Sequence, residues 1–209
     1  MIDVNELWDP NKKGTIIISC YRSGTHFVLD NLNVALATHP MLNLGEVDNY
    51  SFLTRNTDKY ILAILNSVKP KVHLVGNQHK LAQWHKVQLT RNDKIGHWIS
   101  DYLWKYHNTL EQRFNATNLP HHGGTPENYK HIKAVDFDLD VLSSWLLEQH
   151  IVNLFHADVS IDYDDLKSIT GTSIIWNPNV YGLTLEDLFI NHKEIKEFLT
   201  QDVPNVNKK

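Results

Sequence analysis

The sequence predicts an α/β protein in which helices cover both faces of a central, mostly parallel sheet, giving three α/β/α layers. Three short apolar runs, at 15–18, 72–75 and 87–90, have the length and residue types of buried strands. Helical patterns and turns separate these runs, and that alternation is typical of parallel strands joined by crossover helices. With 209 residues, 42% of them hydrophobic and 21% charged, the chain suits one globular domain spanning 1–209.

Composition argues against several classes of partner. The net charge of −4 does not favour a broad nucleic-acid surface. The single cysteine, Cys20, rules out an intrachain disulfide framework and suits a reducing compartment. No segment has the apolar length of a membrane span, and the first residues lack the apolar core of a signal peptide. We therefore expect a cytoplasmic protein without nucleic-acid or membrane partners.

The first strand runs into a polar turn and then into a helix that extends to about residue 38. The first backbone N–H groups of a helix have no intrahelical partner and carry partial positive charge, which favours anions. Gly24 lets the backbone approach a ligand, Ser23 and Thr25 supply hydroxyls, and Arg22 supplies a permanent charge. These residues predict a cradle for phosphate or sulfate. They also suit a plain strand-to-helix turn with Ser and Thr as caps.

The turn departs from the standard nucleotide-triphosphate loop, GxxxxGK[ST]. Gly24 is followed by Thr25 and His26, and the lysine is missing. We expect a P-loop-like fold, and this difference favours an anion that is bound without a metal. The thirteen histidines follow no metal-binding spacing, so we expect no metal site.

The middle of the chain completes the predicted sheet. A loop at 42–48 holds two carboxylates, and a helix is predicted over 51–67, stopped by Pro70. The second strand then ends shortly before His79, and the third ends at Arg91. Because ligands of such sheets bind beyond the carboxyl ends of the strands, we expect Arg22, His79 and Arg91 to meet at one edge.

The remaining elements are mostly helical. Apolar residues at helical spacing predict a helix over 95–106, a long helix over 137–155, and a last helix over 184–198 that begins with a capping box of Thr184 and Asp187. Residues 161–166 change from extended to helical. Between these elements, the Gly- and Pro-containing stretch 114–133 reads as a substrate loop, and 201–209 as a flexible tail.

Two motifs together resemble those of the PAPS-dependent sulfotransferases. One is Arg-Ser-Gly-Thr at 22–25, and the other is the run 91–100, RNDKIGHWIS. The second is closest to the bacterial trehalose-2-sulfotransferase-like branch, whose R-x-D-K-x-x-Q-A-x-S run it matches except at His97 and Trp98. Leu44-Gly45-Glu46 lies where that branch carries a catalytic glutamate. The stretch 161–166, IDYDDL, resembles the family's "YEDL" segment.

The resemblance implies a sulfate donor, PAPS (3′-phosphoadenosine 5′-phosphosulfate), used without a metal. Backbone amides of 23–26, from Ser23 through His26, would hold the 5′-phosphosulfate, while Arg22 would neutralise charge on the breaking bond. Arg91 and Ser100 would bind the 3′-phosphate. The resemblance to this branch implies a small acceptor with a hydroxyl group, with a sugar as the expected class. Members of the family often form pairs, so the resemblance is also compatible with a homodimer.

The general base is less defined than the donor site. Glu46 ranks first by its place in the motif order, and His79 second by its place after a predicted strand. His73 ranks third, because 71–74 keeps part of the family's K-T-H-L run although its position lies early in the predicted strand. Two other functions stay open: a P-loop-like kinase that needs magnesium and ATP, and a non-catalytic module that only binds the anion or nucleotide.

Overall fold

The computed structural model describes residues 2–107, 132–168 and 182–201. The chain divides into two compact units, one formed by 1–92 and 147–176 and the other by 93–146 and 177–209. Each unit has a hydrophobic core of its own. The single domain over 1–209 stays a prediction. The substrate loop and the tail fall almost wholly outside the described residues.

In its described residues, the first unit contains a five-stranded sheet with the order β2-β3-β1-β4-β5, and all its pairings are parallel. This confirms the α/β class and the parallel sheet. The strands are β1 (Gly14–Ser19), β2 (Met41–Glu46), β3 (Tyr60–Leu65), β4 (Trp84–Thr90) and β5 (Val159–Asp162). Every residue of β1 is buried, as expected for a central strand that is covered on both faces.

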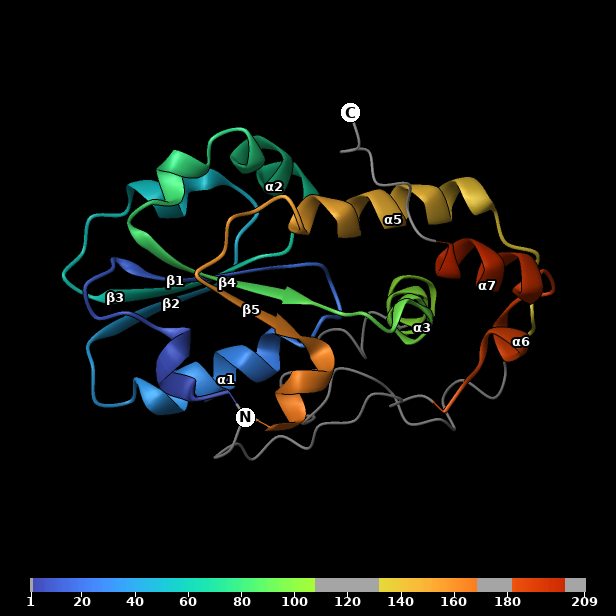
Figure 1. Cartoon of the computed structure of the whole chain (residues 1–209), viewed down its shortest axis with the longest axis horizontal. Helices are drawn as coiled ribbons and strands as arrows, with labels where there is room; N and C mark the ends of the chain where they lie inside the picture. Colours follow the sequence, from blue (N-terminus) through green and yellow to red (C-terminus); the bar gives the residue numbers. More distant parts are fainter. Residues whose placement is uncertain (1, 108–131, 169–181, 202–209) are drawn as a thin grey trace. The chain divides into compact units, whose positions relative to one another are not determined.

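Side chains of the central strand alternate between two cores. Ile17 packs against helix α1 (Thr25–Ala35), whereas Ile16 and Ile18 pack in the core on the opposite face. Helix α2 (Val68–Val75), the short helices η2 (Tyr50–Thr54) and η3 (Gln78–Leu81), and the end of helix α5 (Leu139–Val152) contribute to that second core. Figure 1 shows α1 and α2 on opposite sides of the sheet. The expected three layers are therefore present.

The strand order creates a switch point at the carboxyl edge of the sheet. The connection that leaves β1 through α1 leads to β2 on one side, and the connection that leaves β4 leads to β5 on the other. Ligands of open α/β sheets bind where neighbouring strands send their connections in opposite directions. Here that point lies between β1 and β4, so it is flanked by the turn at 20–24 and by Arg91.

The second unit packs α3 (Lys94–Tyr106), the first part of α5, α6 (Leu185–Leu188) and α7 (His192–Thr200) around an aromatic core. The capping box is confirmed, since the Asp187 carboxylate accepts from the Thr184 N–H at 2.8 Å and from its hydroxyl at 2.7 Å. The single helix predicted over 184–198 is wrong. Phe189 is extended and pairs with Val135, which separates α6 from α7.

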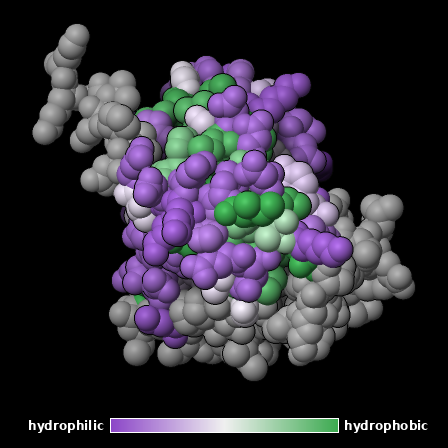
Figure 2. Space-filling view, turned by 90° about the vertical axis from the view of Figure 1, so that its right-hand side faces the viewer, coloured by the Kyte–Doolittle hydropathy of each residue, from purple (hydrophilic) through white to green (hydrophobic). Residues whose placement is uncertain are grey.

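The surface of the described chain is largely polar on the face drawn in Figure 2, where apolar side chains gather in small areas among hydrophilic ones. Within the described residues, no helix combines the length and the apolar character needed to cross a membrane.

The prediction for 42–67 is wrong in two respects. The predicted loop is largely the edge strand β2, and the predicted helix is η2 followed by β3. β2 gives a weak signal because Asn43 and Gly45 are poor strand formers, and the register shifts between them, with Gly45 at a φ of 58°. β3 is a continuous apolar run, and such a run matches helical spacing as well as strand length.

The second predicted strand, 72–75, is also wrong, because it forms the end of helix α2. Pro70 does not stop a helix there. It occupies the third position of α2, where backbone N–H groups have no intrahelical partner and a proline costs little. The apolar residues after it cover the sheet as one helical face.

Candidate anion-binding site

The turn between β1 and α1 has a backbone that only glycine suits at its centre. Gly24 has a φ of 85°, and a Cβ there would lie 2.5 Å from Cδ1 of Leu166 and 3.0 Å from Cδ2 of Tyr163. Arg22 also has a positive φ, of 62°. Strained backbone of this kind persists where the surrounding structure requires it, often at ligand sites. Gly24 is the N-cap of α1 and Thr25 its first residue, so the turn presents the amino end of an 11-residue helix.

Several buried polar side chains gather beside this turn. Among the residues that the structure describes, the hydroxyls of Ser19 and Ser23 and both amide atoms of Asn66 find no hydrogen-bond partner, and each of the three residues is at most 1% exposed. Ile18 lies opposite Leu65 in the sheet, so Ser19 and Asn66 are the next residues on neighbouring strands. A buried polar group that lacks a partner costs about 1–3 kcal/mol. Water or a ligand at this edge would remove that cost.

A fully buried lysine lies behind the same turn. The Lys71 ammonium donates to the Ser19 carbonyl at 2.8 Å and contacts Cys20 Sγ at 3.5 Å, and the residue is 0% exposed. It makes no ion pair with any described residue. A buried charge without a counter-charge is costly, so an anion bound at the turn would be stabilised by it. Sequence reasoning missed Lys71 because the run that follows it, 72–75, reads as a strand, which does not place Lys71 on a helix that faces the turn.

Arg91 follows β4 and is connected to the turn through Tyr163. Its guanidinium lies 4.3 Å from the centre of the Tyr163 ring, and the arginine is 7% exposed. Tyr163 begins η6 (Tyr163–Ser168), the segment that also contacts Gly24. The structure therefore brings together three of the predicted stretches: the turn, the end of β4 and 161–166.

The helix that follows Arg91 belongs to the second unit. Ser100 is buried within α3, and the Asp93 carboxylate caps that helix by accepting from the Gly96 N–H at 2.9 Å. His97 and Trp98, the two residues that depart from the sulfotransferase run, are both buried and pack against Trp145 in the core of this unit. Their identity is thus explained by packing, and Asp93 has a local structural role.

Glu46 and His26 lie side by side. Glu46 ends β2, His26 lies in the first turn of α1, and Oε1 of the glutamate is 3.6 Å from Nε2 of the histidine. Both side chains are about half exposed. One turn further along α1, burial raises the pKa of Asp30, and His26 partly opposes that shift. His26 therefore faces two carboxylates.

A chain of hydrogen bonds links the ends of three strands. Ser67, after β3, donates to Oδ1 of Asp48, after β2, at 2.6 Å. The Tyr21 hydroxyl, after β1, lies 3.2 Å from the Ser67 oxygen. Burial raises the pKa of Tyr21, and the nearby carboxylates of Glu46, Asp48 and Glu148 add to that effect. The sequence showed two carboxylates in 42–48, but nothing in it marked Ser67 as their partner.

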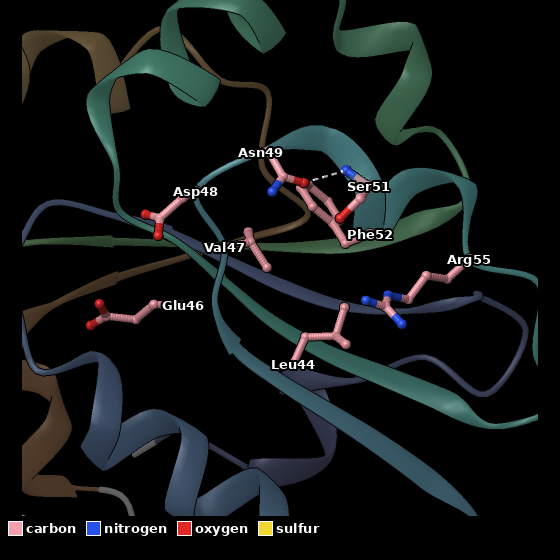
Figure 3. A pocket seen from close by; sticks show the side chains of 8 residues that line it. All are labelled: Leu44, Glu46, Val47, Asp48, Asn49, Ser51, Phe52 and Arg55. Carbon is pink, nitrogen blue, oxygen red and sulfur yellow. Dashed lines mark hydrogen bonds between the residues drawn. The ribbon is translucent and has the colours of Figure 1, made fainter.

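Glu46 and Asp48 both line an open pocket of about 230 Å³ beyond the end of β2. In Figure 3 the Arg55 side chain extends toward the pocket from the side opposite these two carboxylates. The lining residues are Leu44, Glu46, Val47, Asp48, Asn49, Ser51, Phe52 and Arg55. The pocket is thus lined by negatively charged carboxylates and a positively charged guanidinium, and this lining suits a polar ligand.

The two histidines considered as bases lie elsewhere. His79 is in η3, which leads into the start of β4, so its predicted position after the end of a strand is wrong. The backbone carbonyl of Gln83, just before β4, accepts from the backbone N–H of Lys13, just before β1. His79 therefore lies toward the edge of the sheet where the strands begin, and not where they end. His73 is in α2, with its ring 4.1 Å from that of Tyr50.

Comparisons of the chain with protein-family models, curated proteins and solved structures found no match. Among the described residues, no group of three or more His, Cys, Asp or Glu side chains could hold a metal ion.

Proposed function

We propose that the protein is a PAPS-dependent sulfotransferase that transfers a sulfuryl group to a hydroxyl of a small acceptor, with a carbohydrate as the first candidate. The observation that carries this proposal is the composition of the turn at the end of β1. It combines a glycine-centred turn, a helix amino end and the buried Lys71 ammonium, which has no counter-charge among the described residues. The P-loop-like character of the fold belongs to the same proposal.

In this proposal the turn holds the 5′-phosphosulfate of the donor. The backbone amides from Ser23 to His26 donate to its oxygens, and Arg22 offsets charge on the bridging oxygen as the bond to sulfur breaks. Sulfuryl transfer moves a group with charge spread over its oxygens, so positioning and charge stabilisation supply most of the rate, as in phosphoryl transfer. Lys71 contributes a fixed positive charge from behind the turn.

The 3′-phosphate of the donor is assigned to Arg91. The planar guanidinium of Arg91 is held against the Tyr163 ring, so its orientation is restricted before a ligand binds. An arginine that is already ordered loses less entropy when it pairs with a phosphate.

The test is binding of adenosine 3′,5′-bisphosphate, the product that retains both phosphates. Without magnesium it should raise the melting temperature, because a ligand at 100 times its Kd stabilises the native state by about 2.7 kcal/mol. Arg91→Ala should abolish this shift. Lys59→Ala, which removes an exposed charge ahead of β3, should leave the shift unchanged. A shift with ATP and magnesium but none with the bisphosphate would support a kinase and refute the proposal.

A further inference from the structure

The pocket beside β2 contains two carboxylates, and the hydrogen bonds distinguish them. We infer that Asp48 is the catalytic base that takes the proton of the acceptor hydroxyl, with Ser67 and Tyr21 as positioning residues. This inference rests on the proposed sulfotransferase function. It assigns the pocket of Figure 3 to the acceptor, since Asp48 lines it.

Ser67 gives the first argument, because it does not perform the usual task of its position. It is the N-cap of α2, yet its side chain makes no capping hydrogen bond. A serine at this position normally accepts from a backbone N–H of its own helix, which stabilises the helix. Its hydroxyl instead donates to Oδ1 of Asp48 at 2.6 Å. The side chain is therefore used to orient the carboxylate.

The direction of the hydrogen bonds gives the second argument. A hydroxyl has one proton, and that of Ser67 points to Asp48, so the 3.2 Å contact between Ser67 and Tyr21 requires the tyrosine to donate. Two donors in series thus end on one carboxylate oxygen. Asp48 makes no other hydrogen bond or ion pair in the described protein, which leaves Oδ2 available to accept a proton. In acid–base catalysis, one atom of the base is commonly held by a hydrogen bond while another atom of the same group takes the proton of the substrate.

Glu46 has a different set of contacts. Its Oε1 lies 3.6 Å from Nε2 of His26, so it holds the first turn of the helix whose amino end forms the anion site. That contact gives Glu46 a role in shaping the donor site. Among the described residues, Asp48 in contrast accepts its hydrogen bond from the neutral Ser67 hydroxyl, which Tyr21 contacts in turn.

The acceptor oxygen forms a bond to sulfur while its proton moves to Oδ2 of Asp48. The bond between sulfur and the bridging oxygen breaks, and its electron pair stays with the 5′-phosphate. The products are the sulfate ester, adenosine 3′,5′-bisphosphate and a protonated Asp48, which loses its proton to solvent before the next turnover.

The experiment compares acceptors that differ in their need for a base. Glycerol, a model alcohol, must lose its proton during attack, whereas p-nitrophenol is already largely ionised at mildly alkaline pH. Transfer from radiolabelled PAPS to each is measured for the wild type and for Asp48→Asn, which keeps an oxygen for Ser67. We expect at least a 100-fold loss of transfer to glycerol, within the range typical of a general base, and less than a threefold change with p-nitrophenol.

Control variants separate this role from a structural one. Glu46→Gln should retain transfer to glycerol better than Asp48→Asn does. Asp58→Asn, which alters an exposed aspartate beside a Thr57 hydroxyl, should behave as wild type. Ser67→Ala should reduce transfer to glycerol, and Ser67→Thr should restore part of it.

Each outcome decides the inference. Equal losses for both acceptors in Asp48→Asn, or full activity with glycerol, would overturn it. A wild type that binds the bisphosphate but transfers to neither acceptor would also overturn it while leaving the donor site intact. Failure to bind the bisphosphate would instead refute the proposed function itself.

Discussion

Replacing Lys71 by methionine tests whether its buried charge serves ligand binding or folding. The substitution keeps an unbranched side chain that is one atom shorter, and it removes the ammonium. Coulomb's law gives about 2 kcal/mol for two unit charges about 8 Å apart at an effective dielectric constant of about 20, and we take this as the contribution of Lys71. That corresponds to a roughly 30-fold weaker affinity for the bisphosphate in Lys71→Met.

The effect on stability should be small and of either sign. The variant no longer buries an ammonium without a counter-charge, which is favourable, but it leaves the Ser19 carbonyl without the donor now at 2.8 Å, which costs about 1–3 kcal/mol. We therefore expect cooperative unfolding in denaturant and a free energy of unfolding within about 2 kcal/mol of the wild type.

The assay pairs calorimetric titration of the bisphosphate with denaturant unfolding of the same samples. Lys80→Met, which changes an exposed lysine of η3, is the matched control and should alter neither quantity. An unchanged affinity together with a loss of stability above about 3 kcal/mol would refute the reasoning, because Lys71 would then act only as a clamp on the end of β1.

Three further predictions concern the fold around the site. Gly24→Ala should lower the free energy of unfolding by at least about 1 kcal/mol in denaturant and abolish the bisphosphate shift, because its Cβ would lie 2.5 Å from Leu166 in a left-handed backbone. Burial acts to raise the pKa of Asp158, but hydrogen bonds and charge from Lys86 outweigh it and the pKa lies below 3.8. The ionised Asp158 carboxylate therefore stabilises the fold at pH values above 3.8, and this contribution is lost as the pH falls through the lower pKa of the folded state. Asp158→Asn should flatten the acid side of a profile of stability against pH. Trp84→Ala, at a side chain 1% exposed, should cost about 3–5 kcal/mol, measured by thermal and denaturant unfolding.

The first strand and its turn could be predicted from the sequence because all their signals are local. A β-branched run, a glycine in a polar turn and a following helical pattern lie within 15–36, and they form β1, the Gly24 turn and α1. The strand before Arg91 and the helix after it are likewise predicted from signals within their own residues. The parallel sheet followed from this alternation, since parallel neighbours require crossover connections.

The segments at 42–75 could not be predicted in the same way. A continuous apolar run satisfies both strand and helix patterns, and only its pairing decides between them. Residues 60–65 became a strand because they pair with both β1 and β2, whereas 72–75 became helical because they cover that sheet. His79 was predicted at the end of a strand because 72–75 was read as that strand, and these residues are helical instead.

The sequence by itself determined the chemistry of the turn, with its glycine, hydroxyls and arginine at the end of a buried strand. Only the tertiary structure decided which distant residues complete the site. The strand order sets β3 beside β1 and β2 beside β3, so Lys71 reaches the end of β1 and Ser67 reaches both Tyr21 and Asp48. These contacts join residues 19 to 52 positions apart along the chain, and no local pattern encodes which strands will become neighbours.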